Sequence, residues 1–383
     1  DISIKKIKQI DIFAEWYQWL RSIIENPLPE PEPVLPDPIW VDDDNNSGTE
    51  DGSEAYPFNT IGEAMIEATT HTVRVRSGVY YENVVMKDGV KLIGAGADST
   101  IIDGGGSGTA ISCSTVGVSS LISGFRLQNS SLGIYCSSSS PRIQENVIAN
   151  IDLDSLGGDG IRLRNSSPII KNNLINGVGG MGIGASAHSQ PIILNNTIHD
   201  FHYYAGISFA SLDIEAVTPT VKNNIIIRGN SQPVAGILWK TPANVLVSYN
   251  DIYDVGNVTT GSGPSYYGYH NGTQWIDVAG GVGAISEDPL FVDPWMGSFY
   301  LLPDSPCIDA GDPNNMYNDD DGSRNDMGAY GGQRLESGEN GHDGSGFIFT
   351  SVGRIPINEI VQNPFNPSYG LAVVSATAAA DFS

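Results

Sequence analysis

The sequence has few charged residues, and it has no long apolar run. Only 16% of its 383 residues are charged, with 19 Lys and Arg against 44 Asp and Glu, for a formal net charge of −25. Binding to phosphates needs clusters of Lys and Arg, so this charge argues against a nucleic-acid partner. No stretch of about 18 apolar residues is present, and the sequence therefore predicts no transmembrane helix.

The central part of the chain also lacks helical patterning. No amphipathic period of ten or more residues occurs between residues 110 and 255, which excludes helical repeat proteins, whose units are paired helices. This part of the chain instead contains short stretches rich in β-branched residues and bounded by Gly, Pro, Ser and Asn, which is the composition of strands and turns.

One of these phrases recurs along the chain. Its copies are PRIQENVI from Pro141, PIIKNNLI from Pro168, PIILNNTI from Pro191, PTVKNNII from Pro219 and a degenerate LVSYNDI ending at Ile252. A second phrase keeps pace with it, as GIY, GIR, GIG, GIS and GIL, starting at Gly133, Gly160, Gly182, Gly206 and Gly236. Two phrases that repeat together every 20–50 residues or so indicate a solenoid.

The second asparagine of each copy falls at intervals of 27, 23, 28 and 26 residues, at Asn146, Asn173, Asn196, Asn224 and Asn250. Such intervals suit two or three short strands per coil, stacked as a parallel β-helix with strands about 4.8 Å apart. Asparagine is a poor strand former, but in stacked coils its amide can hydrogen-bond along the axis. We therefore predict a structural Asn ladder that turns the chain and satisfies buried polar groups.

Three cysteines are too few for a disulfide framework. Cys113 and Cys136 lie 23 residues apart, about one coil, so they either stack as thiols or bridge two coils, and stacked buried thiols are favoured. Cys307 is then unpaired, and we expect it to be buried beside Ile308.

The first 26 residues differ from the rest. Their apolar side chains fall on one face of a predicted amphipathic helix that ends before Pro27, namely Phe13, Trp16, Tyr17, Leu20, Ile23 and Ile24. Residues 27–38, PLPEPEPVLPDP, read as a polyproline-II spacer reaching about 37 Å. Two roles stay open: the helix caps the open end of its own solenoid, or the spacer delivers it to a partner. That partner would be a second copy, another surface protein or a membrane surface.

Three stretches of the chain resemble known families. WVDDDNNSGTEDGSEAYPFNTIGEAM, VRVRSGVYYENVVMKDGVKLIGAG and STIIDG resemble the first coils of right-handed β-helix proteins related to the pectate-lyase superfamily. DPLFVDPWMGSFYLLPDSPCIDAGDPNNMYNDDDGSRNDMGAYGG resembles the closing phrase of choice-of-anchor Q β-helix proteins. NEIVQNPFNPS, at 358–368, resembles the start of the type IX secretion sorting domain, although the residues after it depart from that pattern and are too few for the whole domain.

Together these features predict an all-β chain with a right-handed parallel β-helix at residues 39–334, including a closing segment at 287–332. Before it lie the helix of residues 1–26 and the Pro-rich linker 27–38. After it comes an irregular, Gly-rich tail, residues 335–383. We expect a secreted or cell-surface protein, with Asp1 an end left by processing.

Two acidic clusters in Gly- and Asn-rich loops are candidate calcium sites, because calcium takes six to eight oxygens from loops of this kind. The first holds Asp42, Asp44 and Asn46, but Ser47 stands where an EF-hand loop needs glycine. The second holds Asp319, Asp321 and Asp326. Solvated acidic turns are the alternative, and Arg324 could pair with one of the second group.

An insertion at about 253–285 interrupts the repeat and is rich in aromatic residues. With Trp239 it supplies a candidate carbohydrate-binding surface, in which sugar rings would stack on aromatic faces. The residues are Trp239, Tyr266, Tyr267, Tyr269 and Trp275. An ordinary loop packed on the flank of the solenoid is the alternative.

Catalytic groups are harder to find. Pectate-lyase chemistry would need Arg beside calcium-binding carboxylates, but GDGIRLRN offers only Asp159, Arg162 and Arg164, and a salt bridge or solvated face is the preferred interpretation. We find no catalytic residues to nominate. The sequence favours a non-catalytic structural or adhesive protein that acts through self-assembly or surface contact. The alternative is a uronate lyase, a glycoside hydrolase or a polysaccharide-binding module.

Overall fold

A computed structural model covers the chain, which divides into two compact units, Asp1–Pro36 and Asp37–Ser383. The structure describes residues 36–153, 157–203, 205–211, 218–227, 235–240, 245–255, 267–270, 275–278, 281–334, 347–350 and 353–356. The predicted helix of residues 1–26, most of the linker, and the sorting-like phrase at 358–368 lie outside these residues.

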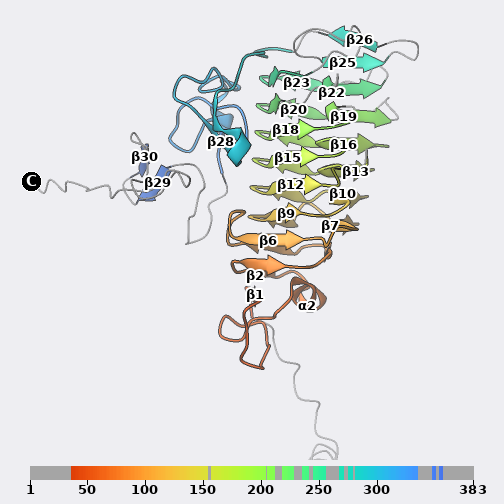
Figure 1. Ribbon diagram of the computed structural model, residues 1–383, viewed down its shortest axis with the longest axis vertical. Helices are drawn as coiled ribbons and strands as arrows, with labels where there is room; N and C mark the ends of the chain where they lie inside the picture. Colours follow the sequence, from red (N-terminus) through yellow and green to blue (C-terminus); the bar gives the residue numbers. More distant parts are fainter. Residues whose placement is uncertain are drawn as a thin grey trace, which may run out of the picture. The chain divides into compact units, whose positions relative to one another are not determined.

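Three parallel sheets run along the second unit and form the sides of a solenoid (Figure 1). Sheet A contains β1 (Ile39–Val41), β2 (Thr72–Val75), β5 (Lys91–Gly94), β8 (Leu121–Ser123), β11 (Arg142–Gln144), β14 (Ile169–Lys171), β17 (Ile192–Leu194), β20 (Thr220–Lys222) and β23 (Leu246–Ser248). Sheet B contains β3 (Gly78–Tyr80), β6 (Thr100–Asp103), β9 (Arg126–Gln128), β12 (Val147–Ile151), β15 (Leu174–Val178), β18 (Thr197–Phe201), β21 (Ile225–Ile227) and β24 (Asp251–Tyr253). Sheet C contains β4 (Val84–Met86), β7 (Thr109–Ser114), β10 (Leu132–Ser137), β13 (Ile161–Arg164), β16 (Ile183–Ser186), β19 (Ala205–Ser211), β22 (Ala235–Lys240), β25 (Tyr267–His270) and the antiparallel β26 (Trp275–Val278).

Each coil passes from sheet A to B to C, and each strand pairs with the equivalent strand of the next coil. In sheet A the register joins Ile143 to Ile170 and Ile170 to Ile193. These side chains are fully buried, as are Ile148, Ile175 and the other isoleucines stacked inside sheet B. Burial of a β-branched column on each sheet makes a one-residue slip costly, since it would turn the column out to water. The predicted parallel β-helix is confirmed.

The second asparagines stack along the turn between sheets A and B. Asn146 Nδ2 donates to Asn173 Oδ1 at 3.1 Å, and Asn173 Nδ2 donates to Asn196 Oδ1 at 3.0 Å. The same contact joins Asn196 to Asn224 at 3.0 Å and Asn224 to Asn250 at 2.9 Å. Each acceptor oxygen also accepts a hydrogen bond from the backbone N–H of the preceding ladder asparagine. For example, the N–H of Asn146 donates to Asn173 Oδ1 at 3.1 Å. All five residues are buried, and the ladder satisfies polar groups that water cannot reach.

The first residue of each pair has a different task. Its backbone lies in the left-handed region, with φ of 57° at Glu145, 55° at Asn172, 50° at Asn195, 59° at Asn223 and 52° at Tyr249. Asparagine tolerates this conformation better than most residues do. The two asparagines of the repeat therefore have different roles. The first bends the chain at the turn, and the second hydrogen-bonds to the next coil.

A second ladder, which the sequence analysis missed, uses serine. Ser139 Oγ accepts the N–H of Val116 at 3.0 Å, Ser166 Oγ accepts that of Ser139 at 3.0 Å, and Ser189 Oγ accepts that of Ser166 at 3.1 Å. Each serine stands two residues before the proline of a repeat, at Pro141, Pro168 and Pro191. That fixed offset was a usable signal in the sequence.

The glycine of the second phrase is set by close contact. A Cβ on Gly133 would lie 2.3 Å from the carbonyl oxygen of Gly160 and 2.6 Å from Ile148 Cγ2. Farther along the same strands, Cys113 and Cys136 pair in register. Both are buried free thiols, the arrangement that the sequence favoured, and Cys307 is also free and buried.

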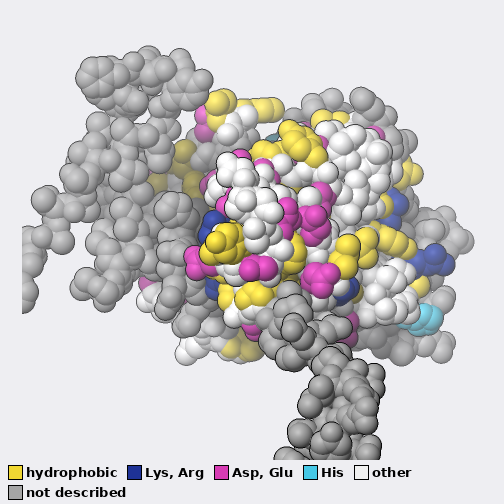
Figure 2. Space-filling model, turned by 90° about the horizontal axis from the view of Figure 1, so that it is seen from below, with side chains coloured by type: hydrophobic (Ala, Val, Ile, Leu, Met, Phe, Trp, Pro, Cys, Tyr) yellow, Lys and Arg dark blue, Asp and Glu magenta, His cyan; other side chains and the backbone are white. Residues whose placement is uncertain are grey.

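A short helix, α2 (Ile61–Glu67), lies at the N-terminal end of the solenoid (Figure 1). Thr60 and Glu63 form a capping box, and Glu82 accepts the N–H groups of Ile61 and Gly62 at 2.8 and 2.7 Å. Its buried residues, among them Ala64 and Met65, face inward, and α2 packs against β1, β2 and β4. This helix was not predicted from the sequence, although Thr60 and Glu63 carry the Thr-x-x-Glu capping signal at its start. Figure 2 views this end, where Asp and Glu side chains gather.

The closing segment does not continue the coils. It contains β27 (Phe291–Asp293), η2 (Pro294–Met296), β28 (Ser298–Leu301) and η3 (Asn315–Tyr317), with β27 and β28 antiparallel. Within the tail, β29 (Phe347–Thr350) and β30 (Gly353–Pro356) form a separate hairpin. No helix among the described residues has the length and apolarity to cross a membrane.

Replacing Asn173 with alanine tests the ladder. The change removes the acceptor for two N–H groups of Asn146 and the donor to the carbonyl oxygens of Ile143 and Lys171. We expect the free energy of unfolding to fall by about 3 kcal/mol, since each buried group left unpaired costs about 1–3 kcal/mol. Urea unfolding followed by circular dichroism measures it. The exposed Asn46→Ala is the matched control and should change stability by less than about 0.5 kcal/mol; equal effects of the two variants would contradict the ladder.

Candidate functional site

A set of buried polar groups lies where the closing segment meets the turn between sheets A and B. We call this contact the seam. The first asparagines of the repeat, whose backbone lies in the left-handed region, hold the seam from the solenoid side. Asn172 Nδ2 donates to the carbonyl oxygens of Ala329 and Gly331 at 3.0 and 2.6 Å. Asn195 Nδ2 donates to Asn325 Oδ1 at 3.0 Å, and Asn223 Oδ1 accepts the N–H of Asp312 at 2.9 Å.

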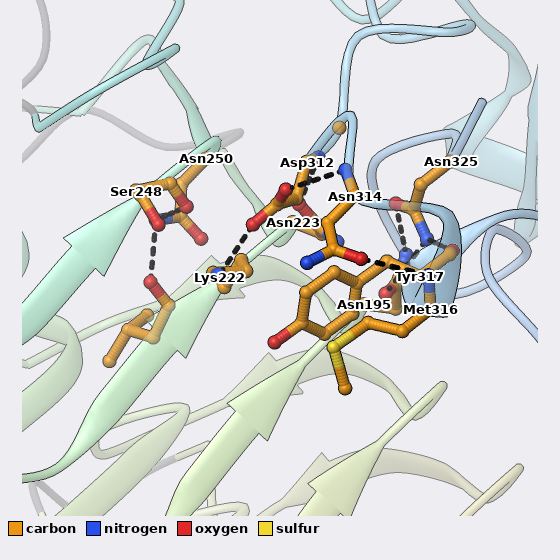
Figure 3. Close-up of polar contacts among 12 residues, drawn as sticks. Asn195, Lys222, Asn223, Ser248, Asn250, Asp312, Asn314, Met316, Tyr317 and Asn325 are labelled. Carbon is orange, nitrogen blue, oxygen red and sulfur yellow. Dashed lines mark hydrogen bonds and ion pairs between the residues drawn. The ribbon is translucent and has the colours of Figure 1, made fainter.

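One ion pair crosses the seam beside these amides (Figure 3). Lys222 Nζ lies 2.5 Å from Asp312 Oδ2 and 4.5 Å from the centre of the Tyr317 ring. Burial alone would lower the pKa of Lys222, but its hydrogen bond to Asp312 and the nearby Tyr317 outweigh burial and raise that pKa. Burial would raise the pKa of Asp312, but Lys222 and the N–H of Asn314 lower it. Both groups therefore stay charged near neutral pH, and the pair acts as a clasp.

An apolar layer lies next to the clasp, on the outer side of sheet B. Phe291, Phe299, Cys307 and Met327 of the closing segment form one buried cluster with residues such as Ile225 of β21. The ring of His199 meets that of Phe299 edge-on, with 5.0 Å between centroids. Burial lowers the pKa of His199, so the imidazole stays neutral in this contact at neutral pH.

Two buried carboxyl groups at the seam have raised pKa values. Burial raises the pKa of Asp251 to about 6, although the Cys307 thiol, 3.2 Å from its Oδ2, donates to it. Burial and the nearby Asp326 carboxylate raise the pKa of Asp319 to about 7. Asp319 accepts the N–H groups of Gly332 and Asp326. These hydrogen bonds hold the end of the closing segment in place.

The carboxylates of the second predicted calcium group have protein partners, and calcium binding there stays a prediction. Asp319 turns inward to the backbone, Asp321 Oδ1 accepts from Ser323, and Asp326 Oδ1 accepts the N–H of Asp309 at 2.8 Å. Arg324 donates to the carbonyl oxygens of Gly311 and Ala310. Within the part of the chain that is described, the acidic group close enough to share a metal ion is Asp42, Asp43 and Asp44.

That first group contains two of the predicted residues, Asp42 and Asp44. Asp43 joins Asp42 and Asp44 in it, and the predicted Asn46 is exposed. Asp42 Oδ2 lies 2.9 Å from Arg76 Nη1, and Asp43 Oδ2 accepts the N–H of Val79 at 3.0 Å. The loop thus already has protein partners for two of its three carboxylates, and calcium binding there stays a prediction.

The candidate arginine site on sheet C is an ion pair. Arg162 and Arg164 both point outward and alternate along the strand with the buried Ile161 and Leu163. Asp159 Oδ2 lies 2.7 Å from Arg162 Nε, and its Oδ1 accepts the N–H of Met181 at 2.9 Å. Burial raises the pKa of Asp159, while Arg162 opposes that shift. The carboxylate is engaged on both oxygens, in keeping with the preferred interpretation from the sequence.

The predicted sugar-binding surface loses one member. Trp239 is 8% exposed and pairs in register with the buried Phe209, so it occupies a core column and offers no face to a sugar. Tyr267 and Tyr269 follow at the register positions of Ile237 and Trp239. Trp275 lies on β26, while Tyr266 and the side chains of Tyr267, Tyr269 and Trp275 lie outside what the structure describes.

The residues that build the seam were not predicted from the sequence. The ladder asparagines were, but their neighbours Asn172, Asn195 and Asn223 and the Lys222–Asp312 pair were not. One signal was available: a doubled asparagine, in which the second member suffices for a ladder, leaves the first to be explained.

Comparison with known proteins bears on the fold. A family model described as a right-handed β-helix region matches residues 109–273, the part that holds the repeats, and supports the right-handed parallel β-helix. No curated protein sequence matches the chain. Similar solved structures include an alginate lyase from Paenibacillus sp. str. FPU-7, 14% identical with a TM-score of 0.37, covering 60% of this chain and 96% of that one. The pectin methylesterase PemA from Erwinia chrysanthemi is 11% identical with a TM-score of 0.30, covering 66% of this chain and 90% of that one. The pectate lyase Pel9A is 12% identical with a TM-score of 0.30, covering 76% of this chain and 96% of that one.

The raised pKa of Asp319 predicts how stability depends on pH. The unfolded carboxyl titrates near 3.8 and the folded one near 7, so its protonated form is favoured in the folded state. Its contribution to stability is complete below about pH 4 and is lost as the pH rises through 7. We expect Asp319→Asn to flatten the rise in unfolding free energy between pH 8 and pH 5. Urea unfolding of both proteins across this range measures it, and the difference between them separates Asp319 from His199, whose lowered pKa acts in the opposite direction. Parallel curves would contradict this account of Asp319.

Proposed function

We propose that this protein is a non-catalytic, extracellular or cell-surface β-helix that acts through contact, by assembling with copies of itself or by attaching to another surface. The solenoid supplies a rigid body whose sides repeat every coil. The predicted amphipathic helix of residues 1–26, on its Pro-rich linker, is one of the contacts.

The observation that carries this proposal is α2. The sequence left two roles for residues 1–26, cap or partner-binding segment. A solenoid needs its open end covered, and α2 covers the first coil with Ile61, Ala64 and Met65, which are buried against β1, β2 and β4. A second helix is not needed for that purpose. This favours the partner-binding role for Phe13, Trp16, Tyr17, Leu20, Ile23 and Ile24.

The location outside the cell is part of the proposal. The net charge of −25 suits a protein kept soluble in salty or calcium-bearing water. The phrase at residues 358–368 and the choice-of-anchor Q-like closing phrase motivate export to the cell surface. Calcium, at Asp42, Asp43 and Asp44, is the proposed ion of the N-terminal loop, and its binding can be measured by calorimetry.

The alternative is a carbohydrate-active enzyme or a polysaccharide-binding module. Asp159 and Arg162, on the outer side of sheet C, are the residues on which a uronate lyase would be tested. The assay follows the absorbance of unsaturated uronate products with polyuronate substrates. Product formation that Arg162→Ala abolishes would replace the proposed function with a lyase.

Deleting residues 1–26 tests the proposal directly. We expect the shortened chain to keep the β-rich circular dichroism spectrum and melting temperature of the full chain, because α2 remains in place. We expect its self-association, or its binding to whole cells, to weaken at least tenfold, because the apolar helix face is gone. Sedimentation velocity and a cell-binding assay measure the two. Loss of folding would assign residues 1–26 to the cap instead.

A further inference from the structure

We propose that the tip of the β27–β28 hairpin of one copy docks on the outer face of sheet A of a second copy. The inference rests on the proposed function and names two surfaces that would make the assembly. They are different surfaces of the same chain, so the contact is head-to-side.

The tip carries the most exposed large apolar side chains of the described structure. Trp295 is 81% exposed and Met296 is 78% exposed. The turn that presents them is well defined: Asp293 Oδ1 accepts the N–H of Met296 at 3.2 Å, and Gly297 closes the turn at φ 82°. Beneath it, Phe291 and Phe299 anchor the hairpin in the seam cluster. A rigid, exposed tryptophan is a typical anchor of a protein interface, because it buries a large area and loses little conformational entropy.

The surroundings of the tip are acidic. Residues 281–323 contain no Lys, Arg or His. Among their carboxylates, Glu287, Asp288 and Asp304 are exposed. A surface that receives this tip must therefore offer apolar contact and positive charge together.

The outer face of sheet A has that combination. Ile169, Ile192 and Leu246 stand in one outward column, in which Ile192 is 41% exposed and Leu246 is 58% exposed. Lys91 and Arg142 belong to the same column, on either side of the buried Leu121. Strands β11 and β17 lie two steps apart, so Arg142 stands about 10 Å from Ile192 along the axis. Within the described strands of sheet A, every outward position is apolar, polar or cationic, and none is Asp or Glu, in a chain with 44 acidic residues.

The hairpin tip does not dock on sheet A of its own chain. Its base is buried against Leu174 and Ile225, on the outer side of sheet B, which is a different side of the solenoid. A second copy is therefore the occupant. A contact between unlike surfaces does not close on itself in a pair, so it builds rings or filaments. Sugar binding to Trp295 is the competing possibility, but aliphatic residues and the charge complementarity favour the protein face.

Two single variants of the full chain separate the halves of the contact. Trp295→Ser removes the tip and leaves the face intact. Ile192→Asp places a negative charge on the face and leaves the tip intact; the column already holds polar residues at Arg142 and Thr220, so the strand tolerates the change. Ile66→Ser, on α2, where Ile66 is 70% exposed, is the matched control.

Sedimentation velocity from about 1 to about 300 μM measures the outcome. We expect each variant to weaken association at least tenfold, which is about 1.4 kcal/mol, while Ile66→Ser assembles like the wild type. We expect an equimolar mixture of the two variants to form a 1:1 complex through this contact, because one partner supplies the only intact tip and the other the only intact face.

The remaining outcomes distinguish this inference from the proposed function. A wild type that assembles alongside variants that assemble equally well overturns the inference and leaves self-association standing. A wild type that stays monomeric and binds no cell surface overturns both. Binding of a polysaccharide that Trp295→Ser abolishes, with assembly unchanged, makes the tip a sugar site and overturns the docking of a second copy.

Discussion

The hydrogen bonds that pass from coil to coil at the turn between sheets A and B are the constraint on which the rest of the structure depends. Short strands pay a large entropic cost to stack, and their turns bury backbone groups that cannot reach water. The ladder from Asn146 to Asn250 resolves both problems, since each amide oxygen takes an N–H of the coil before it. Once the coils are in register, the isoleucine side chains stack in buried columns inside each sheet.

The same turn also determines where the closing segment binds. Because the ladder residue faces inward, its left-handed neighbour projects its amide to the outside, where Asn172 and Asn195 meet carbonyl oxygens of residues 326–331. The carboxyl groups of the closing segment take part in this attachment: Asp312 pairs with Lys222, and Asp319 caps backbone N–H groups. Much of the acidic chemistry here is therefore structural.

The sequence predicted the strongest repeating features, but it did not reveal the serine ladder or the role of Asn172, Asn195 and Asn223, which also repeat. A period shared by two phrases identified the solenoid and the Asn ladder, because every coil obeys the same packing rule. Helix α2 occurs once and is seven residues long, so its capping signal stood alone. Trp239 was misjudged because an aromatic residue beside an insertion resembles a surface residue, whereas strand alternation places it in the core with Phe209. The seam joins residues more than 80 positions apart, such as Lys222 and Asp312, and local patterns do not contain such pairings.

The most direct test of the stacked-coil account is hydrogen exchange at the backbone amides of Asn146, Asn173, Asn196 and Asn224. Each donates to the side chain of the next ladder residue at 2.8–3.1 Å and is buried. The account predicts that these amides exchange among the slowest in the chain, at rates that report unfolding of the whole solenoid. Exchange at rates similar to those of exposed turns would contradict it.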